Sequence, residues 1–243
     1  MNLWQSLFAA LSFMTRLVPA PKDVLKDFYK TVPFFPIVGL ILGAVLTAPF
    51  ALGLLKDKPY VAAWLLAAAN LYLTRGLHYD GLADLFDAWG SLAEKDRFFA
   101  IMKDSRVGAF GALGLIFGVA GQIVLFAALL AAGDFGVIVW ACVFGRGLCV
   151  LLMRLGKAYL RPGMGAMFLP GATGGALAIA MVLTIALGLA LAGSSVVFLS
   201  ALCAAPGLLA LLGLARKNEG LNGDFLGACI VYGELAACLA AVL

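Results

Sequence analysis

The sequence predicts an all-α fold: a polytopic transmembrane helix bundle with about seven spans, in which residues 1–243 form a single integral membrane domain. Hydrophobic residues make up 64% of the chain and charged residues only 12%, whereas soluble domains carry about 25% charged residues. Apolar runs close to the roughly 20 residues that cross a bilayer recur along the chain. No internal repeat and no Pro/Ser-rich linker divides these runs, so one compact membrane domain is expected.

The elements follow from these apolar runs in chain order. Residues 1–15 have the pattern of an amphipathic or partly embedded helix, and they lack the basic start and cleavage site of a signal peptide. The second span carries Asn70 and merges into an acidic motif, which leaves its end poorly defined. The fifth and sixth spans meet around residues 193–195, which predicts a tight hairpin. The seven expected spans are 33–55, 61–77, 107–132, 135–153, 176–193, 194–214 and 225–243.

Basic residues are unevenly distributed over the predicted loops. If the N-terminus is cytoplasmic, 14 of the 17 Lys and Arg residues lie inside, as the positive-inside rule requires. We therefore expect a multi-pass protein of the cell membrane, in a bacterium the inner membrane, with an acidic and basic active-site segment at about 75–106 facing the cytoplasm. The inner set is Arg16, Lys22, Lys26, Lys30, Arg75, Lys95, Arg97, Lys103, Arg106, Arg154, Lys157, Arg161, Arg216 and Lys217.

Charge and cysteine usage exclude several classes of partner. The net charge of +4 fits a basic inner face beside anionic lipid in the bilayer. The basic residues are scattered among short loops and are not clustered with stacking aromatic residues, so nucleic acid is not expected as a partner. The five cysteines lie in apolar runs without a CxxC pair, which favours buried small side chains over zinc ligands or disulfides.

The most informative stretch carries three carboxylates, Asp80, Asp84 and Asp87, at positions i, i+4 and i+7. On an α-helix these positions share one face. Three acids on one stripe repel one another, so something positive must offset them. Hard oxygen ligands at this spacing suit Mg²⁺, which is commonly shared with substrate phosphates. The stripe therefore predicts a magnesium site.

A second polar cluster follows directly before the third span. The Arg106 guanidinium is suited to bidentate contacts with phosphate oxygens, and the Lys103 ammonium acts as a point charge. Gly108 and Gly111 open the span, where free N–H groups of a helix start favour an anion. Together these features predict a diphosphate site. The alternative is an interfacial helix whose acids merely pair with Arg75, Lys103 and Arg106.

His78, the only histidine, has two possible roles. On a continuous helix it is rotated by about 200° from Asp80 and points away from the acids. If the helix begins at or after Asp80, this objection lapses. A catalytic or phosphate-contacting histidine and a structural one both remain open.

Arg146 is a charge inside a predicted span, and Glu234 in the last span is its best counter-ion, because unpaired charges there are costly. A structural ion pair and a substrate contact are both open for Arg146. The loop at 161–168 is either a lid over a bulky substrate or a plain connection.

Two motifs of the chain resemble those of the cobalamin synthase family, also called adenosylcobinamide-GDP ribazoletransferases. Leu-His-x-Asp-Gly-x-x-Asp-x-x-Asp is found at 77–87, and Ile-Met-Lys-Asp-Ser-Arg-x-Gly at 101–108. The chain departs from the family pattern at Asn222, Val231 and Ala88, where Thr, Glu and Gly are usual. Weaker matches, at 13–19, 35–39, 146, 159–165, 223–228 and 234, extend the resemblance over nearly the whole chain.

The resemblance implies a phosphotransfer. A ribose hydroxyl of α-ribazole, or of its 5′-phosphate, attacks the cobinamide-proximal phosphate of adenosylcobinamide-GDP, and GMP leaves. Mg²⁺ is then expected on Asp80, Asp84 and Asp87, and Asp224 completes its shell or steers the hydroxyl. The catalytic residues implied are His78, Asp84, Lys103 and Arg106. The substrate-binding residues implied are Arg75, Asp104, Ser105, Arg146 and Asp224, with Asp104 orienting Arg106.

Other classes of protein compete with this interpretation. A transporter would line its path with acids and Arg146, but most charges lie in one loop segment and no inverted repeat is seen. Enzymes that transfer phospho-alcohols from CDP-linked donors also use acidic helices, yet their motif is absent. A purely structural subunit is disfavoured, because keeping several carboxylates close together costs free energy through their mutual repulsion. A homo-oligomer is compatible with the sequence.

Overall fold

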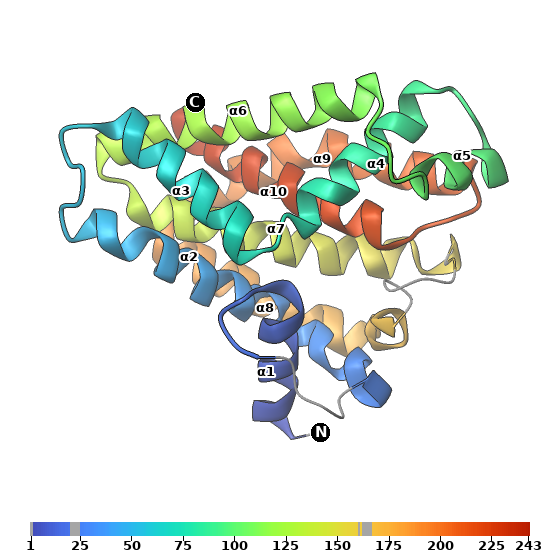
Figure 1. Ribbon diagram of the computed structural model, residues 1–243. Helices are drawn as coiled ribbons and strands as arrows, with labels where there is room; N and C mark the ends of the chain where they lie inside the picture. The colour runs from blue at the N-terminus through green and yellow to red at the C-terminus, as the bar shows by residue number, and fades with distance from the viewer. Residues whose placement is uncertain (1, 20–24, 160, 162–166) are drawn as a thin grey trace.

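The computed structural model describes residues 2–19, 25–159, 161 and 167–243, and in these ranges it contains helices and no strands (Figure 1). Lys22 and residues 162–166 of the expected lid lie outside the described residues. The elements are α1 (Leu3–Met14), η1 (Leu25–Phe34), α2 (Phe35–Ala51), α3 (Pro59–Leu73), α4 (Leu77–Gly90), α5 (Lys95–Met102), α6 (Ala109–Ala132), α7 (Phe135–Leu155), η2 (Lys157–Tyr159), η4 (Leu169–Gly171), α8 (Gly174–Leu191), α9 (Gly193–Lys217) and α10 (Gly223–Val242).

Six of the described helical segments are long and apolar enough to cross a membrane, and each overlaps one predicted span. The all-α membrane bundle is therefore confirmed. The tight hairpin is confirmed as well, because only Ala192 separates α8 from α9 and Gly193 has a φ of +79°. The six segments are Asp27–Ala51, Ala109–Ala132, Phe135–Leu155, Gly174–Leu191, Gly193–Lys217 and Gly223–Val242.

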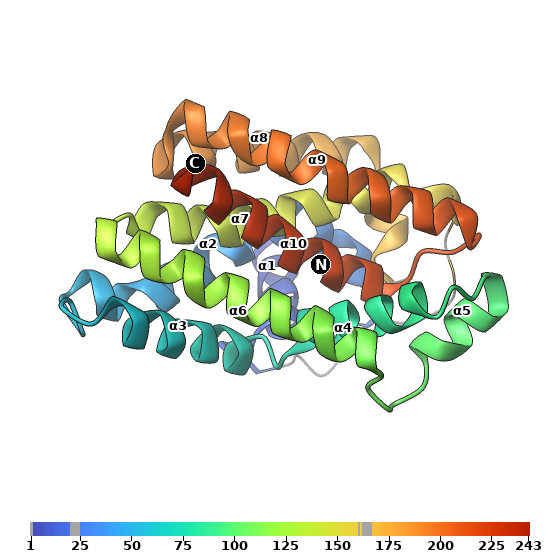
Figure 2. The ribbon, with the colours of Figure 1, turned by 90° about the horizontal axis from the view of Figure 1, so that it is seen from above.

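The second predicted span, 61–77, is wrong at its end. α3 stops at Leu73, and Arg75 and Gly76 take left-handed φ values of 58° and 65° that turn the chain into α4. The 15 residues of α3 reach only about 22 Å at 1.5 Å per residue. α3 and α4 lie one after the other along α6 (Figure 2). The two short helices thus accompany one long span, and α4 brings the acidic stripe into the bundle.

α7 is the central helix of the bundle. It packs against α2, α8 and α10, and most of its residues are buried. Close contact with α2 depends on small residues, since a Cβ on Gly43 would lie 2.8 Å from the Cα of Val139. The outer faces of α6, α8 and α9 instead expose large apolar side chains, as expected of helices in contact with lipid.

The N-terminal helix α1 runs across the direction of the long helices (Figure 1). It buries Ala9, Ala10 and Met14 and leaves Leu3 and Trp4 exposed. The expected N-terminal helix is thereby confirmed, with one face toward the bundle and large apolar side chains turned outward.

One end of the bundle gathers the polar segments, and we call it the polar end: α4, α5, the first turns of α6 and α10, and the last turn of α9 (Figure 1, right). Ion pairs hold α5 against the end of α9. Lys217 Nζ lies 2.9 Å from Glu94 Oε1, and Lys95 Nζ lies 2.8 Å from Glu219 Oε1. The predicted active-site segment at about 75–106 therefore forms a defined part of the fold.

Candidate functional site

α4 and α10 cross at two glycines, and this crossing builds the site. A Cβ on Gly81 would lie 2.8 Å from the Cα and carbonyl oxygen of Asp224. A Cβ on Gly227 would lie 3.1 Å from the Cα and carbonyl oxygen of His78. Because neither position carries a side chain, the two backbones approach closely. The crossing places Asp224, far away in the sequence, beside the acidic stripe.

Replacing Gly81 with alanine is expected to lower the stability of the fold by about 1–3 kcal/mol, the usual cost of overpacking. The added methyl group meets backbone atoms of α10, which cannot rotate away. Gly213→Ala is the matched control, because a Cβ there has no described atom within 4 Å. Thermal unfolding in detergent measures both variants, and equal melting temperatures would contradict the close crossing.

Asn222 begins α10 and holds Asp224. Its Oδ1 accepts a hydrogen bond from the Phe225 N–H at 3.4 Å, and its Nδ2 donates to Asp224 Oδ2 at 2.7 Å. The family's usual threonine can provide the first contact but has no amide for the second. At this departure from the family pattern, the Asp224 carboxylate is held by a side-chain amide.

The carboxylates of Asp80, Asp84 and Asp87 lie on one continuous helix, as predicted, because α4 begins at Leu77. Burial, together with the negative charges of Asp224, Asp80 and Asp87, raises the pKa of Asp84 to about 7. The charges of three other acids thus act on the Asp84 carboxylate. Within the described ranges, no three His, Cys, Asp or Glu side chains already converge closely enough to hold a metal ion. The magnesium site stays a prediction.

Asp87 has a structural function that the sequence pattern did not reveal. Its Oδ2 accepts a hydrogen bond from the Gly108 N–H and its Oδ1 one from the Gly111 N–H, both at 2.7 Å. The carboxylate of α4 therefore caps the first turn of α6, where the helix dipole favours a negative charge. The expectation that these two N–H groups are free for a phosphate is wrong.

The basic cluster lies next to Asp87. Arg106 Nε donates to Asp104 Oδ1 at 3.0 Å and its Nη2 to Oδ2 at 2.6 Å, so the two side chains form the pair that the predicted orienting role of Asp104 requires. Lys103 and Ser105 are exposed beside them. A cavity of about 420 Å³ is lined by Asp87, Asp104 and Arg106 among others. The acidic stripe thus borders an open cavity that carries a guanidinium.

Hydrogen bonds from Arg106 lower the pKa of Asp104 to about 2. Replacing Arg106 with alanine is expected to raise this pKa toward the ordinary value of 3.8, because the carboxylate loses its charged donor. The proton then binds at a higher pH than in the wild type. A carboxyl ¹³C titration measures the change, with Arg97→Ala on α5 as the control, and an unchanged Asp104 titration would contradict the pairing.

Arg75 binds the C-terminal end of the N-terminal helix α1. Its Nη2 donates to the carbonyl oxygens of Ser12 and Phe13, each at 2.6 Å, and to that of Thr15 at 3.2 Å. These acceptors include carbonyls of the last turn of α1, where a positive charge is favourable. Arg75 thus fixes α1 to the start of α4, and its direct contact with substrate stays a prediction.

His78 reaches the acids although α4 is continuous. It lines a cavity of about 90 Å³ together with Asp80 and Asp224, at the first turn of the helix. The imidazole is only 5% exposed, and its Nε2 has no hydrogen-bond partner among the described residues. Burial, and next the positive charge of Arg146, hold the pKa of His78 well below its usual range. The site therefore contains a neutral imidazole with an unused nitrogen.

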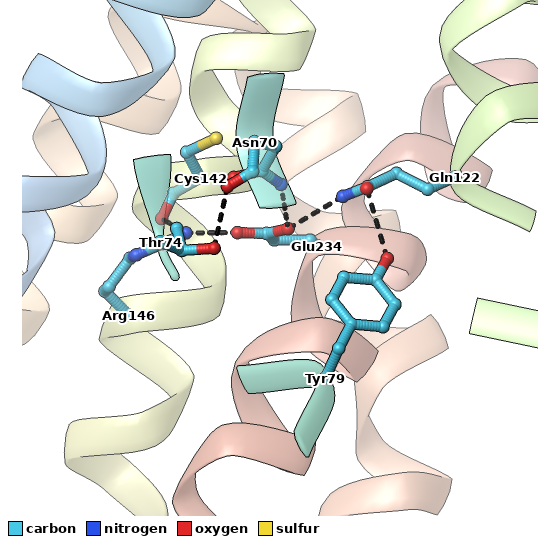
Figure 3. Close-up of polar contacts among 7 residues, drawn as sticks. All are labelled: Asn70, Thr74, Tyr79, Gln122, Cys142, Arg146 and Glu234. Carbon is cyan, nitrogen blue, oxygen red and sulfur yellow. Dashed lines mark hydrogen bonds and ion pairs between the residues drawn. The ribbon is translucent and has the colours of Figure 1, made fainter. Parts of the chain in front are cut away.

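The expected pair of Arg146 and Glu234 is confirmed and belongs to a larger buried network (Figure 3). Arg146 Nη1 donates to Glu234 Oε1, and Gln122 Nε2 donates to Glu234 Oε2 at 2.9 Å. Asn70 Nδ2 donates to the same Oε2 at 3.3 Å, and the Tyr79 hydroxyl donates to Gln122 Oε1 at 3.1 Å. The sequence could have indicated Gln122 and Asn70 as members of this network, because each is a polar residue within an apolar run.

The Arg146 guanidinium keeps unused donors. It is fully buried, and its Nε and Nη2 have no partner within the described part of the chain. Asn70 Oδ1 is likewise unpartnered there. The ion pair is established, whereas a contact between Arg146 and substrate stays a prediction.

Comparison with known proteins gives a consistent result along the chain. A family model described as cobalamin-5-phosphate synthase matches residues 6–242. No solved structure matches the chain.

Relatives named adenosylcobinamide-GDP ribazoletransferase match nearly the whole chain. The protein of Nitratidesulfovibrio vulgaris (strain DSM 19637 / Miyazaki F) is 47% identical over 240 residues, which cover 99% of this chain and 96% of the relative. That of Klebsiella pneumoniae (strain 342) is 36% identical, over 97% of this chain and 98% of the relative. That of Brevibacillus brevis is 35% identical, over 96% of each.

Proposed function

Since the chain belongs to the cobalamin-5-phosphate synthase family, we propose that it transfers a ribazole onto adenosylcobinamide-GDP and releases GMP. The acceptor is α-ribazole or its 5′-phosphate, and the product is adenosylcobalamin or its 5′-phosphate. One structural observation supports this reaction. The α4–α10 crossing brings Asp80, Asp84 and Asp224 together beside a neutral His78.

The reaction exchanges one phosphorus–oxygen bond for another. The acceptor hydroxyl oxygen bonds to the phosphorus next to the cobinamide, and the bond from that phosphorus to the GMP oxygen breaks. His78 Nε2 takes the hydroxyl proton, a role that its buried, neutral state supports. Asp224, held by Asn222, steers the hydroxyl. Lys103 and Arg106 offset the charge that develops on GMP.

Magnesium fits the residues of this site. The crowding that raises the pKa of Asp84 leaves a concentration of carboxylate oxygens, the donors that Mg²⁺ prefers. Asp80 and Asp84 would hold the ion, with Asp87 contributing beside its contacts to α6. When bound, Mg²⁺ supplies positive charge to the transferred phosphate. Asp104 keeps Arg106 in place for the leaving group.

We place the polar end on the cytoplasmic side, with the apolar faces of the long helices in the lipid of a bacterial inner membrane. Basic residues of α5, α9 and the 103–106 segment support this orientation. A cysteine at position 106 should react with an impermeant maleimide only after the cells are opened. One at position 57, on the opposite end, should react in intact cells, and the reverse pattern would contradict the orientation.

The function is tested with purified protein in lipid nanodiscs, given adenosylcobinamide-GDP and either α-ribazole or its 5′-phosphate. With Mg²⁺ we expect GMP and a cobalamin product. Chelation with EDTA should lower the rate by at least about 100-fold, and added Mg²⁺ should restore it. Absence of product from both acceptors, or substrate flux into sealed vesicles without product, would overturn the proposal.

A further inference from the structure

The cavity beside the first turn of α4 has two chemically different walls. One wall carries His78 and Asp224, the groups assigned above to the acceptor hydroxyl, together with Asp80, which is assigned to the metal ion. The other wall is apolar, and three phenylalanines give it an aromatic character. They come from separate parts of the chain, Phe13 in α1, Phe35 at the start of α2, and Phe168 before η4.

Phe168 is the centre of a packed aromatic cluster. Its ring centroid lies 4.7 Å from that of Phe13, 5.2 Å from that of Phe28 and 5.4 Å from that of Phe35. The interplanar angles are 69°, 70° and 76°, the edge-to-face arrangement that aromatic rings favour. The wall is therefore preorganised to receive another flat ring.

The charge of the cavity limits what can enter it. Among the described residues, its lining contains the carboxylates of Asp80 and Asp224 and the buried imidazole of His78, and no Lys or Arg. A diphosphate would meet two carboxylates and no cation of the described ranges there, whereas the guanidinium of Arg106 lines the separate cavity beside Asp87. The 90 Å³ of the cavity is several times the roughly 10–15 Å³ that one water needs. A ligand with an uncharged aromatic group and a nearby hydroxyl fits the cavity, because the aromatic group can contact the apolar wall and the hydroxyl can contact the polar wall.

The position of Phe13 is fixed independently of the cluster. Arg75 Nη2 donates to the Phe13 carbonyl oxygen and to that of Ser12, each at 2.6 Å. Arg75 itself is part of the turn that leads into α4. The aromatic wall on α1 and the polar wall on α4 are thus connected through one guanidinium.

We infer that Phe13, Phe35 and Phe168 form the subsite for the aromatic base of the acceptor nucleoside, and that its ribose hydroxyl then faces His78, Asp80 and Asp224. The inference rests on the proposed function and adds the location of the acceptor base within the site. In this arrangement Arg75 is a positioning residue that acts through Phe13. The phosphates of the donor lie on the other side of the acidic stripe, toward Arg106.

The test is a set of Phe13 variants assayed with both substrates varied. Phe13→Leu keeps an apolar side chain but removes the ring, and we expect it to raise the KM for α-ribazole about 10-fold, as loss of base stacking does. The KM for adenosylcobinamide-GDP should not change. Phe13→Tyr should restore the acceptor KM. Phe198→Leu, on an exposed part of α9, is the matched control and should match the wild type.

Binding without turnover provides the second measurement. Calorimetry with α-ribazole alone should show about 10-fold weaker binding to Phe13→Leu, whereas ribose 5-phosphate, which has no base, should bind both proteins equally. An unchanged acceptor KM, or an increase confined to the donor KM, would overturn the inference while wild-type activity persists. A wild-type protein without transferase activity would overturn the proposed function instead.

Discussion

Asp84→Asn is expected to lower the rate of GMP release by about 10²–10³-fold, the scale of losing a group that acts on transition-state charge. Asparagine has nearly the same shape but no negative charge for a metal ion. The same change removes repulsion with Asp80, Asp87 and Asp224, the charges that raise the pKa of Asp84 to about 7. The melting temperature should therefore stay equal or rise while activity falls. Initial rates of GMP release and thermal unfolding measure the two effects.

Asp57→Asn provides the control for Asp84→Asn. Asp57 is exposed in the connection between α2 and α3, at the opposite end of the bundle from α4. Its replacement should leave both rate and melting temperature unchanged. Full activity of Asp84→Asn would show that the acidic stripe does not take part in the transfer. A large drop in its melting temperature would show that the carboxylate is structural.

Glu234→Met is expected to destabilise the protein by about 3–5 kcal/mol, because it leaves the fully buried Arg146 without its carboxylate. Gln122 and Asn70 lose their acceptor in the same change. Arg146→Met should also be destabilising, because it leaves the buried Glu234 carboxylate without its guanidinium. The double variant Arg146→Met/Glu234→Met removes both charges and should be more stable than either single variant. Unfolding free energies in a double-mutant cycle measure the coupling.

The double variant also separates the two roles open to Arg146. If the guanidinium serves only the ion pair, activity should return together with stability. If its unpartnered Nε and Nη2 contact substrate, stability should return while the KM stays high. Additive losses of stability in the cycle would contradict the ion pair itself. Ser200→Ala, in a buried position of α9 that accepts from Trp140, controls for general effects of altering a buried polar contact.

Local patterns predicted the architecture well, for a physical reason. A span must satisfy its backbone within one helix and expose apolar side chains to lipid, so its length and composition are visible in a short window. The run at 107–132 accordingly matches α6, Ala109–Ala132. The pair of Arg146 and Glu234 was predictable for a related reason, since an intramembrane charge requires a partner and few residues qualify.

Local sequence patterns could not predict contacts between segments that lie far apart in the chain. Spacing on α4 indicated that Asp80, Asp84 and Asp87 share a stripe, but not that Asp87 caps α6. Nor did it show that His78 meets Asp224 at one cavity, because that depends on how α10 crosses α4. The break after α3 was left poorly defined because Leu77 and the residues around the turn at Arg75 and Gly76 extend the apolar run into the acidic motif, and the left-handed φ of Arg75 is not visible in the sequence.

The position of α10 has a consequence for how the protein is made. As the last described helix, it provides both Asp224 of the site and Glu234, the carboxylate that compensates Arg146. Until α10 is synthesised and inserted, α7 carries a buried guanidinium without a counter-charge, and α4 has no helix to cross. The nascent protein therefore holds an unpaired charge on α7 until α10 has been inserted. Completion of the active site and release from this unstable intermediate are the same event.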